Sequence, residues 1–224
     1  MTYLSRQDAA IVTAAVTTAE EMTSGEIVTV LAGQSDGYSD IALGWAAVAA
    51  FTAMSVFAVW PAFFLGMIDA LMGGWGHVWT HGEIISLTIA LGLIKFLVVW
   101  LIQLWQPLKF LLIPGPVKTA RVHARAISHF KVGAERRTHG RTGIMIYLSM
   151  REHRAEIVAD QPIAIRVPAE VWGEAMADML GEIRQGRIAQ GMAAGIRDVG
   201  VVLSQHFPRG DGDVNELPDR LIEV

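Results

Sequence analysis

The sequence predicts an α/β domain, a small mixed sheet sandwiched by helices, that is interrupted by a transmembrane helical hairpin. Of the 224 residues, 52% are hydrophobic and only 18% are charged, whereas soluble domains carry about 25% charged residues. The hydrophobic excess is concentrated between residues 41 and 113. The flanking pieces, 1–40 and 114–224, instead combine strand-like apolar runs with amphipathic helical patterns.

Residues 1–40 are expected to supply the first helix and the first strand of the domain. Ser5, followed three residues later by Asp8, is typical of a helix start that resembles a capping box. The expected apolar face of this helix is Ile11, Ala15, Ala19 and Met22. Glu26–Ala32 is a nearly continuous apolar run rich in β-branched residues, as a buried strand requires. A polar linker, Gly33–Asp40, follows.

Residues 41–113 are predicted to form the hairpin, with spans at about 41–65 and 84–105. The first apolar run, Ile41–Ile68, contains no charged residue, and about 20 apolar residues cross a bilayer as a helix. Pro61 is expected to kink or end this span. Lys95 lies near the middle of the second span. It either contacts a partner helix or snorkels toward an interface if the span slides.

The distribution of Lys and Arg predicts the orientation of the hairpin. The loop 66–83 contains neither residue, whereas the flank after the second span contains four: Lys109, Lys118, Arg121 and Arg125. Both termini are therefore expected to be cytoplasmic, with the loop outside the inner membrane of the cell. His77 and His81 in the loop are four residues apart, but no helical pattern aligns them as a metal site.

Residues 114–208 are expected to complete the domain. Pro114–Pro116 stops the membrane helix, and Lys118–His139 is amphipathic. The expected apolar face of that helix is Ala120, Ala124, Ile127, Phe130 and Ala134. Two strands follow, Ile144–Ser149 and Arg154–Ala159. The first two strands of the chain, joined through a helix, should be parallel, and the third should pair antiparallel with the second.

Two closing helices and a tail end the chain. The apolar stripes of the helices are Val171, Trp172, Ala175, Met179 and Ile183, and then Ile188, Met192, Ile196, Val199 and Leu203. Gly186 separates the helices and Phe207–Pro208 ends the second. Residues 209–224 form a polar, acidic tail that is either loosely ordered or laid over the domain.

Charge and composition exclude several functions. The net charge of −4 and the absence of a pattern in which aromatic and basic residues alternate argue against nucleic-acid binding. The absence of cysteine excludes disulfides, thiolate metal sites and Cys nucleophiles. Lys118, Arg121 and Arg125 form a basic stripe beside the membrane, which predicts contact with anionic lipid headgroups. The alternative is that these charges only fix the topology.

The motifs of both soluble pieces resemble the TPM domain family. They are TSGEIVTVLAG, RTHGRTGIMIYLS, EIVAD and NELPD, and the resemblance covers about two-thirds of the chain. It is closest to short membrane-anchored bacterial members with a hydrophobic hairpin after the first strand. It implies a small sheet between helices. It also implies functions that range from acid phosphatase to repair of photosystems and assistance of a receptor, with a metal ion, usually calcium, in some members.

Carboxylates are the candidate ligands for such a cation. Asp36 follows the first strand, and Glu156 and Asp160 share a face of the third strand because they are four residues apart. With a tail acid such as Asp213 or Glu216, they would offer oxygen ligands to calcium or another hard cation. The alternative is that they are solvated acids of edge strands and loops. In place of the family's glycine-rich turn stands ADQPI, with Asp160 as its only carboxylate.

Two functions are consistent with these observations. The first is a non-enzymatic, membrane-anchored module in assembly, repair or quality control of membrane protein complexes, with membrane lipids and another membrane protein as partners and with scope for homo-oligomers. The second is a metal-dependent, acid phosphatase-like hydrolase. The sequence favours the first, because it shows no nucleophile elbow, phosphate-binding loop or two-histidine zinc motif.

Overall fold

A computed structural model of the chain describes residues 3–72, 77–133, 142–210 and 216–224. The chain divides into two compact units, one made of residues 1–36 and 115–224 and the other of residues 37–114. The first unit is the α/β domain and the second is the helical hairpin. Each is described by itself.

The α/β domain is built on a four-stranded mixed sheet with the order β3-β2-β1-β4. The strands are β1 (Glu26–Ala32), β2 (Gly143–Ser149), β3 (Arg154–Ala159) and β4 (Ile222–Glu223). β1 pairs in parallel with β2 from Glu26 opposite Gly143 to Ala32 opposite Ser149. β3 is antiparallel to β2, and β4 is parallel to β1. The predicted order and directions of the first three strands are therefore confirmed.

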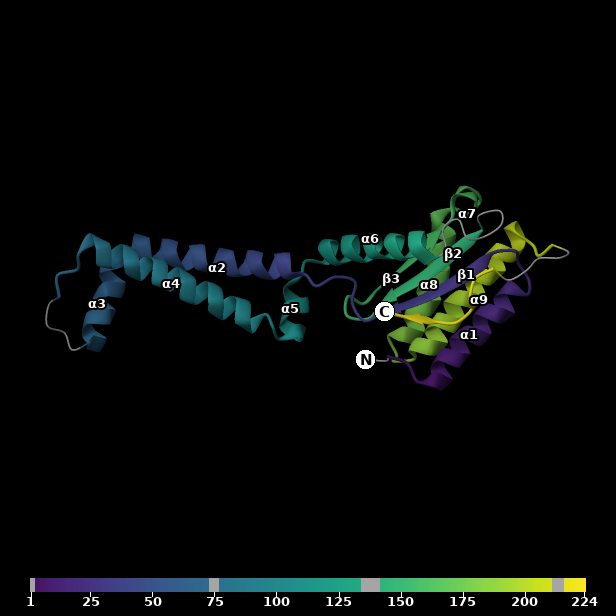
Figure 1. Cartoon of the computed structure of the whole chain (residues 1–224), viewed down its shortest axis with the longest axis horizontal. Coiled ribbons are helices and arrows are strands. Elements are labelled where there is room, and N and C mark those ends of the chain that lie inside the picture. Colours follow the sequence, from purple (N-terminus) through teal and green to yellow (C-terminus); the bar gives the residue numbers. More distant parts are fainter. Residues whose placement is uncertain (1–2, 73–76, 134–141, 211–215) are drawn as a thin grey trace. The chain divides into compact units, whose positions relative to one another are not determined.

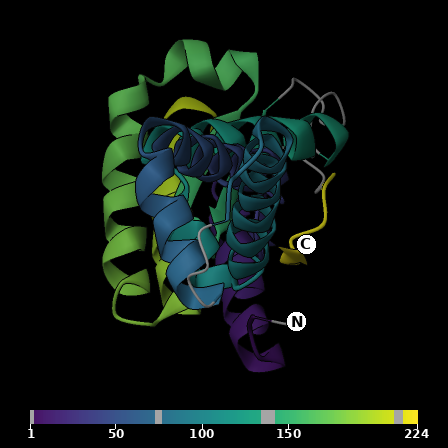
Figure 2. The ribbon, with the colours of Figure 1, turned by 90° about the vertical axis from the view of Figure 1, so that its left-hand side faces the viewer.

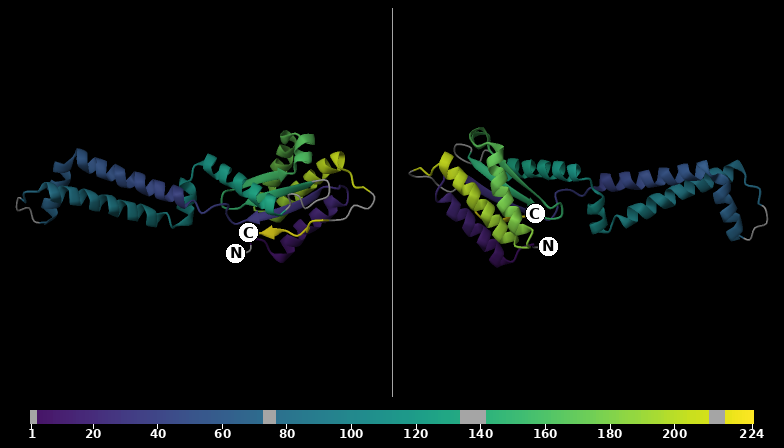
Figure 3. Two further views of the ribbon diagram at one scale, coloured as in Figure 1. Left: turned by 45° about the horizontal axis from the view of Figure 1, so that its top comes forward. Right: turned by 180° about the vertical axis from the view of Figure 1, so that it is seen from behind.

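Helices cover both faces of this sheet, as Figures 1 and 3 show. On one face lie α1 (Arg6–Glu20), α8 (Ala169–Ile183) and α9 (Ile188–His206), and on the other lies α6 (Gly115–Gly133). Side chains of β1 alternate between the two cores: Ile27 and Leu31 enter the first, and Val28 and Val30 enter the second. The predicted α/β sandwich is confirmed.

The α8 and α9 stripes bury as predicted, but the buried faces of two other helices differ from those expected. In α1 the buried residues include Val12 and Val16, while Ile11 and Met22 are exposed. In α6 Phe130 is buried as expected, and Val122 and Ala126 join it, whereas Ala120 and Ala124 are exposed. Both helices are rich in alanine, so two neighbouring faces had similar apolar content. Packing against the sheet selected the face that carries valine.

Two features of the domain were not predicted. The residues after β3 form a short helix, α7 (Gln161–Arg166), with Asp160 at its N-cap position. The described part of the C-terminal tail lies over the domain, which is one of the two alternatives considered, and it ends in β4. The backbone N–H of Val224 donates to Leu31 O at 3.0 Å, and that of Gly33 donates to Val224 O at 2.9 Å.

The described residues of the hairpin unit form two long helices and two short ones. The long helices are α2 (Ser39–Val59) and α4 (His81–Ile102), and the short ones are α3 (Pro61–Met72) and α5 (Gln106–Leu112). Both long helices are long and apolar enough to cross a membrane. Pro61 was expected to kink or end the first span, and the structure shows an end: α2 stops at Val59, short of the predicted bound near residue 65. A separate helix, which was not predicted, begins at Pro61. Figure 2 views the long helices end-on.

Candidate functional site

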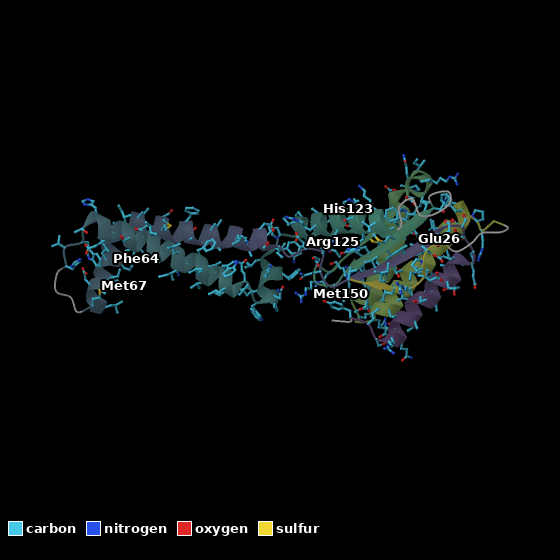
Figure 4. The ribbon with its side chains drawn as sticks, viewed as in Figure 1. Glu26, Phe64, Met67, His123, Arg125 and Met150 are labelled. Carbon is cyan, nitrogen blue, oxygen red and sulfur yellow. The ribbon has the colours of Figure 1, made fainter. Side chains whose placement is uncertain are left out.

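A cavity of about 220 Å³ lies where the end of α1, the start of β1 and the C-terminal tail meet. The residues that line it are all of polar or charged types and are Thr17, Glu20, Glu21, Thr23, Glu26, Arg209 and Asp219. Figure 4 labels Glu26 at this end of β1. The cavity therefore gathers carboxylates from two segments that are almost 200 positions apart in the chain.

Thr23 and Glu26 of the TSGEI segment line part of the cavity. Hydrogen bonds to Phe207, the residue that ends α9, hold this segment in place. The hydroxyl of Thr23 donates to the carbonyl of Phe207 at 2.6 Å and accepts the backbone N–H of Gly25 at 3.0 Å. The backbone N–H of Ser24 donates to the same Phe207 carbonyl at 3.0 Å. These bonds fix the turn between α1 and β1, and with it the directions of the flanking Glu20 and Glu26.

Glu26 holds the C-terminal segment in place. Its carboxylate accepts the backbone N–H of Glu216 at 3.2 Å and that of Leu217 at 3.1 Å. Leu217 is buried in the core between α6 and the sheet. Asp219 adds a second attachment, since its Oδ2 accepts the hydroxyl of Thr17 at 2.5 Å. Glu216, Leu217 and Asp219, in the described part of the NELPD motif, are thereby held to the start of β1 and to α1.

Glu20, which lines the cavity, has a strongly raised pKa. Its side chain is only 8% exposed, and its Oε1 accepts the backbone N–H of Ile27 at 2.7 Å. Burial raises its pKa from the ordinary 4.5 to about 8. The hydrogen bond from Ile27 opposes this rise, and the nearby carboxylates of Glu26 and Asp219 add to it, while Arg209 lowers the pKa. Glu20 is therefore protonated in the folded protein at neutral pH.

The raised pKa of Glu20 predicts that the domain loses stability as the pH rises. Between about 4.5 and 8 the folded state holds a proton that the unfolded state has released, so stability is fully present at the acid end of this window and lost toward its alkaline end. The fall should approach about 1.4 kcal/mol per pH unit, the slope for one proton. Glu20→Gln keeps an oxygen for Ile27 and removes the proton, so its free energy of unfolding should vary less with pH.

Denaturant unfolding at pH 5, 6, 7 and 8 measures this difference. The matched control is Glu21→Gln, because Glu21 is the exposed neighbour at the same cavity. It should retain the wild-type pH dependence. Parallel curves for the wild-type protein and Glu20→Gln would show that Glu20 does not hold the proton.

The chemistry available at this cavity is that of a carboxyl with a raised pKa, Glu20, beside the carboxyl groups of Glu26 and Asp219. A protonated carboxyl beside ionised ones is the arrangement used for general acid–base catalysis. In this protein, however, oxygens of Glu20, Glu26 and Asp219 accept hydrogen bonds from the protein's own backbone or hydroxyl groups. The geometry accordingly suits a structural role, in which these hydrogen bonds hold the tail to the domain.

The structure does not assemble the carboxylates that the sequence suggested as metal ligands. Asp36 pairs with Arg121 at 2.9 Å. Glu156 contacts the Nδ1 of His123 at 3.3 Å, and Asp160 accepts the backbone N–H of Gly143 at 3.1 Å. Asp213 lies outside the described residues.

The sheet register explains this separation. Asp36 follows the C-terminal end of β1, whereas Asp160 lies beside the first residue of β2, at the opposite end of the parallel pair. Within the part of the chain that the structure describes, no group of three or more His, Cys, Asp or Glu side chains is arranged to hold a metal ion. Asp36 and Asp160, two of the carboxylates predicted as ligands, therefore lie at opposite ends of the sheet.

A second polar cluster, which the sequence did not reveal, lies at the other end of the sheet. The buried carboxylate of Glu152 accepts the backbone N–H of Ser35 at 2.8 Å and the hydroxyl of Ser149 at 2.6 Å. The Ser35 hydroxyl also bonds to Ser149 at 2.9 Å and to the Tyr147 hydroxyl at 3.1 Å. Burial raises the pKa of Tyr147. These bonds tie the segment after β1 to the turn between β2 and β3.

The predicted lipid-facing residues all lie on α6. Arg121 and Arg125 are exposed, and Lys118 is half-buried. The ion pair of Arg121 with Asp36 joins surface groups, so it contributes at most about 1 kcal/mol. Arg125 lies near His129, whose pKa is lowered first by burial and then by this guanidinium. Lys118, Arg121 and Arg125 therefore all lie on α6, which covers the face of the sheet opposite α1, α8 and α9.

The sequence places Glu26 at the start of the first strand and does not single out Glu20. The available signal was that TSGEI and NELPD, two of the motifs behind the family resemblance, both contain a carboxylate next to a turn residue. Their meeting in space depends on the tail returning to β1, which no local pattern encodes.

Comparison with known proteins gives one informative result. No family model and no curated protein matches the chain. Among solved structures, the BA42 protein of the psychrophilic bacterium Bizionia argentinensis, determined by NMR, is similar, with a TM-score of 0.58 and 16% sequence identity. The match covers 100% of this chain and 97% of that one. At this identity the similarity shows a shared fold alone.

Proposed function

We propose that this protein is a membrane-anchored member of the TPM domain family, whose α/β domain serves as a non-enzymatic module in assembly, repair or quality control of membrane protein complexes. The family assignment is supported by the motifs of the two soluble pieces and by the small sheet between helices, which is the architecture the family implies. The partners proposed are membrane lipids and another membrane protein, and a second copy of the chain is a further candidate.

The observation that carries the non-enzymatic role is the use of the cavity carboxylates by the chain itself. Glu26 accepts two backbone N–H groups of the tail, and Glu20 accepts that of Ile27. A catalytic carboxylate must instead be within hydrogen-bond reach of a substrate proton. The cavity carboxylates are best explained as structural groups that hold the tail against the domain. The tail then adds β4 to the sheet and so forms part of the surface of the domain.

The membrane anchor is proposed to be the pair α2 and α4. The apolar windows of the two helices are only 17% and 6% buried within the structure, so their outward faces require an apolar environment. Trp45 and Trp105 lie near one end of the pair and Trp60 and Trp79 near the other, as in the aromatic belts of membrane proteins. The excess of Lys and Arg after α4 supports an orientation with both termini in the cytoplasm, next to the inner membrane.

The basic stripe of α6 should bind anionic lipid. In the α/β domain freed of the hairpin, changing Lys118, Arg121 and Arg125 together to Gln should weaken binding to vesicles that contain phosphatidylglycerol. The expected loss is up to about 3 kcal/mol at low salt, at about 1 kcal/mol per charge, and it should fade as the salt concentration rises. Vesicle co-sedimentation across a salt series measures both effects.

A control triple variant removes the same charge from the other side of the sheet. Arg6, Arg184 and Arg197 are exposed residues of, or directly after, α1, α8 and α9. Their change to Gln should leave vesicle binding nearly unaltered. If the two triple variants lose affinity equally, net charge rather than the α6 stripe determines binding, and the three residues act only as topology signals.

A metal-dependent phosphatase is the second candidate function, and the observation that favours it is the protonated Glu20 beside Glu26 and Asp219. Turnover of p-nitrophenyl phosphate by the full chain in nanodiscs, with Ca²⁺, Mg²⁺ or Mn²⁺ between pH 5 and 8, distinguishes the two. The non-enzymatic role predicts no turnover beyond that of Glu20→Gln or Asp160→Ala. Metal-dependent turnover that either substitution abolishes would establish the phosphatase instead.

The proposed role also predicts a stable assembly. After cross-linking in native membranes, the tagged full chain should retain a membrane protein through purification. The control is the tagged hairpin alone, residues 37–114, which lacks the α/β domain and should not retain it. Identical proteins on both baits would show that the α/β domain does not recognise the partner.

A further inference from the structure

Helix α3 (Pro61–Met72) has an outward face that is entirely apolar. Apart from the terminal Met72, the exposed residues recur along one side of the helix and are Ala62, Phe63, Gly66, Met67, Ala70 and Leu71. Three of them are large, and they lie four residues apart: Phe63 is 67% exposed, Met67 49% and Leu71 81%. A surface helix of a water-soluble unit would present polar side chains on this side.

The polar residue of α3 lies on the opposite, inner side. Asp69 is half-buried and accepts the indole N–H of Trp79 at 3.1 Å. Beside it, Leu65 is 8% exposed, and the Phe64 ring contacts the Phe57 ring of α2 with centroids 5.7 Å apart. The inner side of α3 therefore contacts the end of α2 and the loop. The apolar side of α3 is exposed.

The direction and length of α3 limit the position that this helix can take in a membrane. Figures 1 and 2 show α3 turned across the axis of the α2 and α4 pair: it is seen lengthwise in the view in which the pair is seen end-on. Its 12 residues span about 18 Å, which is shorter than the roughly 30 Å hydrocarbon core of a bilayer. A helix of this length and direction can occupy one leaflet but cannot cross the membrane.

We propose that α3 is a third membrane-immersed helix, confined to the leaflet at the hairpin tip, whose apolar face contacts lipid acyl chains. The inference rests on the proposal that α2 and α4 span the membrane. Lipid is the occupant because the outward faces of α2, α3 and α4 share their large apolar side chains, with the exposed Lys95 of α4 as a charged exception, so one environment covers all three. The charge of α3 is also directed inward, as hydrocarbon requires.

The cysteine-free sequence permits a direct test in the full chain, reconstituted in phosphatidylethanolamine and phosphatidylglycerol vesicles. Nitroxide labels are attached to single variants Phe63→Cys, Met67→Cys and Leu71→Cys. Two reference sites frame the result: Leu93→Cys, 60% exposed on α4, for the bilayer core, and Val78→Cys, 85% exposed in the loop, for water. Power saturation compares accessibility to oxygen, which concentrates in lipid, with accessibility to a water-soluble nickel complex.

The labels on α3 should show an oxygen-to-nickel ratio shifted from the Val78 value toward the Leu93 value. Water-like ratios on α3, together with a lipid-like Leu93, would overturn the leaflet helix and leave the membrane anchor intact. Low accessibility to both reagents, with dipolar coupling between labels, would replace lipid by a second copy of the chain. A water-like ratio at Leu93 would instead contradict the anchor on which the inference rests.

Discussion

A chain in which Ile41–Ile113 is replaced by a short flexible linker should be soluble and should unfold cooperatively. The residues of the two core clusters all lie within 4–32 or 122–222, so the replacement removes none of them. The β1 and β2 strands pair along seven residues across the insertion. The replacement removes most of the large exposed apolar side chains, which are an aggregation hazard in water.

Size-exclusion chromatography and denaturant unfolding followed by circular dichroism measure this result. A single monomeric peak and one transition, coincident by two probes, are expected. The control is the fragment 1–40 alone, which should remain unfolded because β1 then lacks β2. An aggregated product from the linker variant, or one without a cooperative transition, would mean that the hairpin contributes to the core of the domain.

Within this soluble domain, Phe130→Ala should lower the free energy of unfolding by about 3–5 kcal/mol, the range for a buried Phe in a core. Phe130 is 5% exposed and packs between α6 and the sheet together with Val122 and Ala126. Among the described residues, α6 is the one helix that packs on this face, so few neighbours can move to fill the space of the lost ring. The size of this loss in unfolding free energy measures how much the packing of α6 on the sheet contributes to stability.

Two variants of the same helix calibrate that effect. Val132 is 72% exposed, so Val132→Ala should change stability by no more than about 0.5 kcal/mol. Ile127 is half-buried, and Ile127→Ala should give an intermediate loss. The denaturant dependence of the free energy should be the same in all three variants. A Phe130→Ala loss as small as that of Val132→Ala would show that α6 does not pack on the sheet in solution.

The strands could be predicted because each carries a local signal. EIVTVLA and IMIYLS are continuous apolar runs bounded by glycine and polar turns, and both strands are fully buried. Burial on both faces leaves no room for polar alternation, so such runs identify central strands. The parallel pairing then follows from the connection through a helix.

The features that could not be predicted depend on tertiary contacts. The face of α1 was ambiguous because alanine occurs on both sides of Val12 and Val16, and packing decided between them. The strand β4 has two residues and is set by its neighbour β1, not by its own sequence. The acidic cavity exists only because the tail returns to Glu26, so its members cannot be listed from spacing alone.

The division of α3 from the first span shows the limit of hydropathy in the same way. Ile41–Ile68 is uniformly apolar, so its apolar content alone marks no end to the span. Pro61 lacks the N–H that would continue the hydrogen-bonding pattern of α2, and the chain therefore turns at Trp60 and starts a new helix. The proline predicted the break, while the direction of the next helix depended on its contacts with Phe57 and Trp79.

The central claim, an α/β domain held at the cytoplasmic face of a membrane by an inserted hairpin, is tested most directly by cysteine accessibility. Val78→Cys in the hairpin loop and Gly210→Cys in the tail are both exposed positions in an otherwise cysteine-free chain. In intact spheroplasts a membrane-impermeant maleimide should label Cys introduced at Val78 at once and that at Gly210 only after lysis. Labelling of both sites before lysis, or of neither, would contradict the claim.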